Sequence, residues 1–239
     1  MTCSRNPKQY PVQKLMYLIK PSVEIITPID APAMMARIEA AARTCYRSEA
    51  KITPDSAPKM IKSLIARDHS SVLEHESISI RIICDRGVMA ELTRQRHNSF
   101  SIESTRYVSY NKRGMTFVIP PWTNIAEGEL KAENYLLERH DFLSDADFVW
   151  ATAMLSAECY YNTLTQRGWT PEKARSVLPN SLATTIVTTA NLRQWRTVLK
   201  LRTAKAAHPQ AREVMNDFYD KLIAAGLGVF FEDIQPYRE

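Results

Sequence analysis

The segment ESISIRIICD, residues Glu76–Asp85, alternates apolar and polar side chains along its length. Ile78, Ile80 and Ile82 occupy alternate positions, and Ser77, Ser79 and Arg81 alternate with them. Successive side chains of a β-strand point to opposite faces, so this period of two predicts a strand with one buried face. The strand is expected to stop at Asp85-Arg86-Gly87, and the fold must therefore contain a β-sheet.

The chain before this strand carries two helical patterns and an earlier extended region. Residues 15–29 are rich in apolar and β-branched side chains, which favours one or two initial strands. Residues 30–46 place apolar side chains at helical spacing after Asp30, a candidate N-cap. Residues 56–69 repeat that pattern, with Ser56 as the candidate N-cap. Two amphipathic helices are therefore expected between the first strands and the segment quoted above.

The chain after this strand predicts one more strand and several helices. Residues 182–191 are rich in β-branched side chains and are expected to be extended. We expect Thr170 and Asn191 to cap helices and Gly226 to close the last long helix. The expected helices, in chain order, cover residues 88–96, 145–168, 170–178, 191–203 and 208–226.

These patterns together predict a single α+β domain over residues 1–239. Its central mixed or antiparallel sheet would be flanked by helices, and residues 1–15 would form a flexible N-terminal extension. A chain of 239 residues with 45% hydrophobic content can bury a sizeable core. It has no run of about eighteen apolar residues and no apolar start of the signal-peptide type, so we expect a cytoplasmic protein. The four cysteines lie far apart without a C-x-x-C pair, which indicates free thiols.

The charge of the chain limits the ligands it could bind. A formal net charge of +5 permits a nucleic-acid partner, but the basic residues are not gathered into the block expected of a duplex binder. A small anion fits this charge equally well. The sequence has six glycines and no Gly-rich phosphate loop, so any phosphate must be held by side chains.

A second segment, RQRHNSFSIESTRY at Arg94–Tyr107, gathers three arginines and several hydroxyl side chains. A guanidinium is a flat fork of donors that matches phosphate or carboxylate oxygens. Arginines converging from several elements would form a cradle for a phosphorylated small molecule, although each arginine alone could equally be a solvated surface residue. The arginines in question are Arg94, Arg96, Arg106, Arg175, Arg193, Arg196 and Arg202.

The sequence gives less support for a metal site or for a catalytic nucleophile. The segment HSSVLEHE, from His69, offers two imidazoles and two carboxylates, but its spacing is neither i, i+4 nor H-E-x-x-H, and we expect no metal site. His69 and His75 could equally be ordinary buried or capping histidines. The serines after Arg96 lack a G-x-S-x-G context, so the sequence offers little for a nucleophilic triad.

The arginine-rich segment resembles the signature of the flavin-dependent thymidylate synthases, the ThyX family. That signature is R-H-R followed by seven residues and a serine, here Arg94, Gln95, Arg96 and Ser104. Three further segments, HSSVLEH, ARSVLP and NLRQWRTVLKLRT, resemble other family segments in the same order. The resemblance runs from about Ala40 to the FFEDI sequence near the C-terminus.

The resemblance implies a homotetramer that binds FAD between subunits and converts dUMP to dTMP. Methylenetetrahydrofolate would donate the carbon and NADPH would reduce the flavin, with neither nucleic acid nor membrane as a partner. His69, one of two implied catalytic residues, would stand beside the flavin ring. The implied flavin-binding positions are Ser71, Glu74, Arg94, Gln95, Arg96, Ile102, Asn191, Arg193 and Thr197.

Arg202 is the second catalytic residue that the resemblance implies. It would face the uracil ring and favour ionisation at N3, since a fixed cation stabilises nearby negative charge in a poorly hydrated site. No enzyme nucleophile is needed, and none of the four cysteines follows a proline as in the unrelated classical thymidylate synthases. The implied dUMP-binding positions are Glu91, Arg94, Glu103, Ser104, Thr105, Arg106, Arg175 and Arg202.

The sequence departs from the family pattern at three positions. Gln95 replaces the middle histidine of R-H-R, so a neutral amide stands where a titratable ring is expected. Glu91 replaces a glutamine near dUMP, where a carboxylate would repel the nucleotide unless an arginine pairs with it. Ile102 replaces a polar residue. These departures leave room for an altered substrate or product.

Two other functions therefore stay open at this point. One keeps the flavin and folate but ends in hydroxymethylation of a pyrimidine nucleotide. The other is a non-enzymatic, basic module that binds nucleic acid, which would show no flavin colour and a steep loss of affinity with salt.

Overall fold

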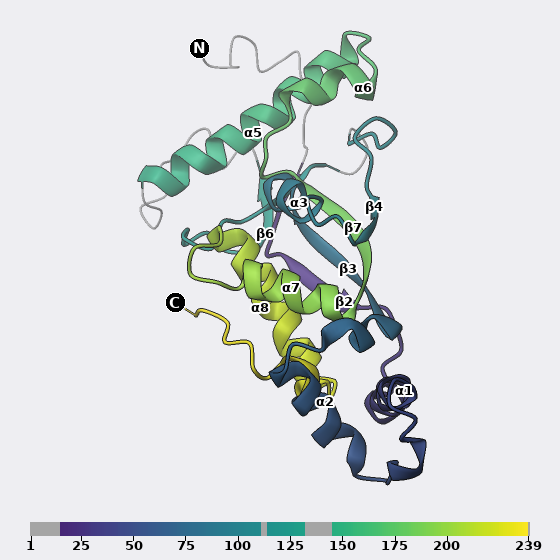
Figure 1. Ribbon diagram of the computed structural model, residues 1–239. Coiled ribbons are helices and arrows are strands. Elements are labelled where there is room, and N and C mark those ends of the chain that lie inside the picture. Colours follow the sequence, from purple (N-terminus) through teal and green to yellow (C-terminus); the bar gives the residue numbers. More distant parts are fainter. Residues whose placement is uncertain (1–14, 111–113, 132–144, 239) are drawn as a thin grey trace. The chain divides into compact units, whose positions relative to one another are not determined.

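The computed structural model describes residues 15–110, 114–131 and 145–238 (Figure 1). The first fourteen residues of the predicted N-terminal extension lie outside this part of the chain, and Leu15 begins a strand. The chain divides into two compact units, and the expectation of a single domain stays a prediction. Unit 1 comprises Met1–Pro21, Ile83–Ala90 and Ile102–Thr185, and unit 2 comprises Ser22–Ile82, Glu91–Ser101 and Ile186–Glu239.

Unit 1 contains a three-stranded mixed sheet with the strand order β5-β1-β6. Strand β1 runs parallel to β5 and antiparallel to β6, so that Tyr17 lies opposite both Thr116 and Glu129. The elements that lie wholly in unit 1 are β1 (Leu15–Ile19), β5 (Thr116–Val118), β6 (Gly128–Lys131), α5 (Asp145–Gln166), α6 (Pro171–Ala174) and the 3-10 helix η3 (Arg175–Val177).

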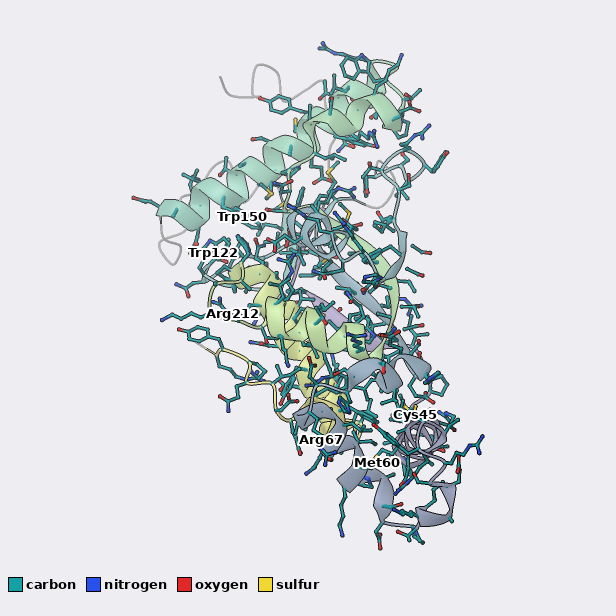
Figure 2. The ribbon with its side chains drawn as sticks, viewed as in Figure 1. Cys45, Met60, Arg67, Trp122, Trp150 and Arg212 are labelled. Carbon is teal, nitrogen blue, oxygen red and sulfur yellow. The ribbon has the colours of Figure 1, made fainter. Side chains whose placement is uncertain are left out.

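The core of unit 1 forms between this sheet and the long helix α5. Met16 and Phe117 from the sheet belong to the same fully buried cluster as Tyr161 from α5. Helix α5 also holds the sheet through polar contacts, because a Glu158 carboxylate oxygen accepts a hydrogen bond from the main chain of Met115 at 3.0 Å. Trp150, labelled in Figure 2, is packed against the cluster. These contacts fix α5, and the short α6 and η3 follow it.

Unit 2 contains most of a four-stranded sheet with the order β2-β3-β7-β4. Four elements contribute residues to both units: β3 (Ser77–Asp85), α3 (Arg86–Leu92), β4 (Ser99–Ile102) and β7 (Ala183–Asn191). The elements wholly in unit 2 are β2 (Ser22–Ile25), α1 (Ala31–Thr44), η1 (Glu49–Lys51), α2 (Ser56–Ala66), η2 (Ser70–His75), α7 (Leu192–Arg202), α8 (Pro209–Ala224) and α9 (Gly228–Phe231).

Helix α7 is anchored on this sheet by Trp195. The indole Nε1 donates to the main-chain oxygen of Ile78 in β3 at 2.9 Å, and the ring packs edge-on against Phe218 of α8 with centroids 4.8 Å apart. Figure 1 shows α7 and α8 side by side next to β2 and β3. Because Trp195 occupies the buried face of α7, the exposed face of this helix can present Arg193 to a ligand.

Most of the predicted long elements are confirmed, with shifts at their ends. The strand predicted over Glu76–Asp85 is β3, and its alternate isoleucines are fully buried. Two helix caps are also confirmed, because Asp30 accepts from the Ala33 main chain at 3.0 Å and Asn191 accepts from that of Gln194 at 2.8 Å. After α8, Gly226 adopts a φ of 80°, the left-handed conformation expected of a closing glycine.

Two cap predictions are wrong in detail. Asp55 precedes α2 as its N-cap, and Ser56 is the first residue of the helix. The Ser56 hydroxyl donates instead to a Glu39 carboxylate oxygen at 2.9 Å, an interaction with α1 that local sequence does not reveal. Thr170 does precede α6, but its side chain makes no capping hydrogen bond. That helix is only four residues long, so the predicted helix over 170–178 continues as the 3-10 turn η3.

The prediction of an α+β fold with a mixed sheet is confirmed, whereas the prediction of one central sheet is wrong. The strands divide between two sheets, and β4, β5 and β6 were not predicted. Each of these three strands has only three or four residues, too few to establish a period of two. The helix predicted over 88–96 begins at Arg86 and ends at Leu92, so Arg94 lies beyond it.

The contacts of Arg196 stabilise the fold near α9. Its side chain is only 7% exposed, and it forms an ion pair with Asp233 at 2.6 Å and donates to the main-chain oxygen of Phe230. Hydrogen bonding to Arg196 holds the pKa of the Asp233 carboxyl below its usual value. The expectation that Arg196 contributes to an anion cradle is therefore wrong, because its donors bind the chain near α9.

Asp233→Asn should lower the free energy of unfolding by about 1 to 2 kcal/mol near neutral pH, a figure reduced because Asp233 is 43% exposed. A carboxyl with a depressed folded-state pKa stabilises above its unfolded value and loses that effect as pH falls through the folded value. The difference between wild type and variant should therefore shrink below about pH 4. Urea unfolding of both proteins, from neutral pH to below pH 4, measures this difference in the free energy of unfolding.

The matched control is Asp220→Asn, which removes a carboxylate from an exposed pair with Arg238. This change should cost less than about 0.5 kcal/mol, as exposed ion pairs usually do. A loss for Asp233→Asn that stayed constant from neutral to acid pH would contradict the assigned contribution of the ion pair.

Among the described helices, none combines the length and apolar character that a membrane crossing requires. Cys45, Cys84 and Cys159 are free thiols, as predicted, while Cys3 lies outside the described residues.

Candidate functional site

A tight turn after β4 presents several predicted substrate-binding residues in unit 1. The main-chain N–H of Glu103 donates to Thr185 of β7 at 2.9 Å, which fixes the end of β4. The chain then turns, and the Ser104 hydroxyl accepts from the main-chain N–H of Arg106 at 3.2 Å. Ser104 also accepts at its main-chain oxygen from Val108 at 3.0 Å. Local hydrogen bonds therefore hold Ser104, Thr105 and Arg106 in one fixed turn.

Arg175 of η3 reaches the same turn from another part of unit 1. Its Nη1 atom lies 3.4 Å from the hydroxyl of the buried Thr105. Arg106 has a long ion-pair contact, 3.9 Å, with Glu172 of α6. The structure thus brings together four residues that the sequence predicted for the substrate, from segments about seventy positions apart. Both guanidinium groups are exposed and can bind an anion.

Glu103 has its side chain engaged next to this turn. Its carboxylate accepts from the Tyr110 hydroxyl at 2.9 Å. Burial, followed by the nearby Glu103 charge, raises the pKa of Tyr110 well above its usual value, so the phenol remains a proton donor. Tyr110 was not singled out in the sequence, and only its pairing with Glu103 in three dimensions reveals it. The pair stiffens the segment that carries Ser104.

The predicted flavin-binding residues of η2 and α7 lie together in unit 2. Glu74 of η2 forms an ion pair with Arg193 of α7 at 2.6 Å, and both side chains are about half exposed. Asn191 caps the start of α7, and the Thr197 hydroxyl donates to the Arg193 main-chain oxygen at 3.2 Å. Four of the implied positions are therefore grouped around the first turns of α7.

His69 and Ser71 lie at the start of η2 and are exposed. Asp68, just before His69, has a φ of 56°, an uncommon conformation that turns the chain sharply between α2 and η2. The His69 main chain then donates to Leu64 at 2.9 Å, which closes α2. In the described residues, no three histidine, cysteine or acidic side chains gather as a metal site would require.

Arg94, Gln95 and Arg96 occupy a turn between α3 and β4. Gln95 closes the turn through a main-chain hydrogen bond to Leu92 at 3.0 Å. Arg94 and Arg96 are exposed, and neither pairs with a carboxylate within residues 15–110, 114–131 and 145–238. Asn98, which the sequence reasoning missed, donates to the Thr188 hydroxyl at 3.3 Å, and its own amide oxygen is buried without a described partner. This turn therefore offers unpaired cationic donors to a ligand.

Arg202, at the end of α7, is held by a single residue. One terminal nitrogen pairs with the Glu91 carboxylate, and the other donates to the Glu91 main-chain oxygen at 2.9 Å. The arginine side chain is 15% exposed. Its Nε atom is buried and has no hydrogen-bond partner in the described part of the chain. The condition stated for Glu91, that an arginine must pair with it, is thus met, and these two contacts use two of the five N–H groups of the Arg202 guanidinium.

Comparison with known proteins agrees with this geometry. Residues 29–225 match the family described as "Thymidylate synthase complementing protein". A flavin-dependent thymidylate synthase of Mycobacterium tuberculosis H37Rv is 33% identical over 224 residues, which cover 92% of this chain and 86% of the relative. A probable flavin-dependent thymidylate synthase of Mycobacterium phage D29 is 33% identical over 202 residues, covering 83% and 81% of the two chains.

Solved structures show the same fold. ThyX from Helicobacter pylori, crystallised with FAD and dUMP, superposes with a TM-score of 0.69 at 23% identity, covering 90% of this chain and 99% of that one. The UMP/dUMP methylase PolB from Streptomyces cacaoi, bound with 5-Br UMP, gives a TM-score of 0.66 at 27% identity, with 90% and 94% of the chains covered.

Fold, arginine clusters and relatives together define an enzyme of the flavin-dependent nucleotide methylase class. Within this class, the chain belongs to the ThyX family of flavin-dependent thymidylate synthases. The resemblance seen in the sequence is thereby confirmed. The alternative of a non-enzymatic nucleic-acid-binding module is wrong, because the family match spans most of the chain.

Proposed function

We propose that the protein converts dUMP to dTMP, with methylenetetrahydrofolate as the carbon donor, FAD as the cofactor and NADPH as its reductant. The observation that carries this proposal is the meeting of Arg175 with the turn from Ser104 to Arg106. The two exposed guanidinium groups and the partly exposed Ser104 hydroxyl form a donor set suited to a nucleotide phosphate.

The charges around this turn favour a dianion. Among the described residues, Arg175 contacts the neutral Thr105 hydroxyl there, and Arg106 has the long contact with Glu172 and lies over the Tyr107 ring, 5.5 Å from its centroid. A phosphate would give both guanidinium groups charge-assisted hydrogen bonds that the unliganded chain does not provide. Ser104 is assigned as a substrate ligand and not as a nucleophile, since its hydroxyl is already oriented by the Arg106 main chain.

A second set of residues fits a flavin and its phosphates. Arg94 and Arg96 are exposed and lack carboxylate partners among the described residues, so their guanidinium groups can bind an anion. We assign Arg94, Arg96 and Arg193 to the flavin phosphates. Gln95, Ile102, Asn191, Thr197 and the η2 residues His69, Ser71 and Glu74 complete the proposed flavin site, in a homotetramer with the flavin between subunits.

Arg202 is the proposed catalytic residue on the protein side. When bound, the flavin supplies the hydride that reduces the transferred one-carbon unit to a methyl group. Arg202, whose side chain is partly exposed, would place its guanidinium at a ring oxygen or nitrogen of the pyrimidine and stabilise negative charge that develops there. His69, exposed at the start of η2, would contact the face of the flavin where the folate approaches.

The proposal is tested on the full-length protein by absorption spectroscopy and product analysis. The purified protein should retain a flavin band after FAD addition and desalting, and dUMP should shift that band. With methylenetetrahydrofolate and NADPH, the product should have the mass of dTMP. A protein that binds no flavin, or that shows the flavin band but leaves dUMP unchanged, would contradict the proposal.

Two alternative reactions share this site. The similarity to PolB, described as a UMP/dUMP methylase, supports UMP as a second substrate. The departures at Gln95 and Glu91 support hydroxymethylation, whose product carries one oxygen atom more than dTMP. The same mass measurement, run with UMP and dUMP in parallel, separates all three reactions.

Gln95→His restores the middle residue of R-H-R and should leave flavin binding and the product unchanged. The side chain lies in a turn fixed by its main chain, so either residue can be accommodated there. We expect the change in kcat to stay well below the roughly 10²-fold effect of gaining or losing an acid–base group. Steady-state kinetics with product mass checks this, and a switch of product would show instead that Gln95 has a specialised role.

A further inference from the structure

We infer that Tyr237, which follows α9 in the chain, is a positioning residue for Arg202. It holds the end of α7 in place and so contributes to turnover without touching the nucleotide. This inference rests on the proposed function, because it takes Arg202 as the residue that acts on the pyrimidine ring. Tyr237, Arg202 and the residues that connect them all belong to unit 2.

Arg202 is the last residue of α7, and its position depends on two anchors. The first is Glu91, whose carboxylate and main-chain oxygen accept hydrogen bonds from the two terminal nitrogens of the guanidinium. The second is the main chain at the end of the helix. Helix ends fray because their final carbonyl groups have no partner within the helix. The main chain of Arg202 is therefore only as well placed as the last turn of α7.

The segment of residues 234–238 supplies a partner for this last turn. Thr203, the C-cap of α7, is buried, and its N–H and hydroxyl both donate to the main-chain oxygen of Leu199, at 2.9 and 2.7 Å. Its own carbonyl accepts from the main-chain N–H of Tyr237 at 2.9 Å. The residue directly after Arg202 is thus tied to a distant part of the chain.

The loop between α7 and α8 is held by the same tyrosine. The buried Arg212 of α8, labelled in Figure 2, donates from Nη1 to the main-chain oxygens of Lys205 at 3.0 Å and Ala207 at 2.9 Å. The Tyr237 ring centroid lies 5.1 Å from the Arg212 guanidinium carbon and 5.5 Å from the Lys205 ammonium, within the range of cation–π attraction. One aromatic ring therefore contacts both the arginine that fixes the loop and a lysine of the loop itself.

Segment 234–238 is in turn fixed along α8. The Tyr219 hydroxyl donates to the main-chain oxygen of Ile234 at 3.2 Å, and the Asn216 side chain donates to that of Tyr237 at 3.0 Å. Figure 1 shows this part of the chain beside α8. The main chain of Tyr237 is thus bonded on both sides, to the end of α7 through its N–H and to α8 through its oxygen.

The precision required of Arg202 gives Tyr237 its expected effect on the reaction. A donor displaced by about 1 Å from its productive position can cost on the order of 10²-fold in rate. Glu91 fixes the guanidinium relative to the end of α3, but it does not bond to the main chain of Arg202. If the last turn of α7 frays, Arg202 must change its rotamer or leave the carboxylate. Loss of the Tyr237 ring should therefore lower kcat more than it weakens binding.

The test is a double-mutant cycle on the full-length protein loaded with FAD. The steady-state constants for dUMP are measured for wild type, Tyr237→Ala, Arg202→Ala and the double variant. Tyr237→Ala should lower kcat by about tenfold and leave the Michaelis constant and the flavin band nearly unchanged. The same change should have little effect in the Arg202→Ala background, because the residue through which Tyr237 acts is already gone. Tyr237→Phe keeps the ring and should restore wild-type kcat.

Hydrogen exchange provides a readout that does not depend on activity. Tyr237→Ala should speed exchange at the main-chain N–H of Thr203, while the amide of Trp195 in the middle of α7 stays protected. Asn216→Ala removes the tie between α8 and the Tyr237 main chain, so it should have the same two effects in smaller size. This variant also serves as the test if Tyr237→Ala does not fold.

The matched control is Arg238→Ala, which removes an exposed ion pair with Asp220 at the next position and should leave kcat and exchange unchanged. An unchanged kcat in a folded Tyr237→Ala protein would overturn the inference. An equal loss of kcat with and without Arg202 would overturn it too, and both results leave the proposed function standing. Wild-type protein that converts no dUMP would overturn both.

Discussion

Arg202→Ala should fold and bind FAD normally but lose about 10²- to 10³-fold in kcat, the effect of removing one fixed donor from developing negative charge. The residue lies at the last position of α7, after the turns that pack on the sheet, so its removal leaves the Trp195 anchor in place. The Michaelis constant for dUMP should change much less than kcat. Single-turnover oxidation of the reduced flavin, monitored by absorbance, measures the chemical step separately from dUMP binding.

Lys200→Ala provides the control for Arg202, because it removes a positive charge from an exposed position of the same helix. It should leave kcat close to wild type. Arg202→Ala also leaves the Glu91 carboxylate without its partner, so Arg202→Ala combined with Glu91→Gln should be measured as well. Normal turnover in Arg202→Ala, or in Arg202→Ala combined with Glu91→Gln, would exclude the proposed role of Arg202 in stabilising negative charge on the pyrimidine ring.

Arg175→Ala should weaken dUMP binding by about 10- to 100-fold, the range expected when a charged hydrogen-bonding partner is lost. Within the described part of the chain, the guanidinium contacts a neutral hydroxyl at 3.4 Å and no carboxylate, so its removal leaves no described carboxylate uncompensated. Stability should therefore change little. Calorimetric titration of the FAD-loaded protein measures the affinity directly.

Deoxyuridine, which lacks the phosphate, makes the test of Arg175 specific. If Arg175 binds the phosphate, wild type and variant should bind deoxyuridine equally weakly, and the large difference should appear only with dUMP. Lys173→Ala removes an exposed charge from the neighbouring α6 and should have little effect on either ligand. An equal loss for dUMP and deoxyuridine would place Arg175 near the base or sugar.

The sequence predicted those parts of the fold whose local pattern is long enough to be read. Strand β3 alternates polar and apolar residues from Ser77 to Ile82, and β7 has nine residues with alternate burial. Asp30 and Asn191 bond to main-chain groups three positions away, so their capping follows from local sequence. The Ser56 hydroxyl instead bonds to Glu39, seventeen positions away, and no local rule contains that contact.

In the candidate site, too, some features could be predicted from the sequence, whereas others depend on contacts that form only in the folded chain. The family resemblance assigned Ser104, Thr105, Arg106 and Arg175 to one ligand, an assignment that stays a prediction, and the structure places Arg175 on the turn that the other three form. The sequence also indicated that Glu91 would need an arginine, but which arginine depended on α7 meeting the end of α3. Tyr110 was missed because its hydrogen bond to Glu103 forms across a turn that the sequence did not reveal, and Asn98 was missed because its partner Thr188 lies ninety positions away.

The ion pair between Glu74 and Arg193 has a consequence for how the cofactor is taken up. In the unliganded chain the carboxylate already occupies the donor that we assign to a flavin phosphate. On that proposed assignment, loading would replace the Glu74 contact at Nη1 of Arg193 with a phosphate contact. Both side chains are about half exposed, so breaking the pair costs only about 1 kcal/mol or less, and the arginine is kept oriented until the phosphate arrives. Added salt weakens exposed ion pairs, so it would weaken both the Glu74–Arg193 pair and the proposed contact between Arg193 and the phosphate.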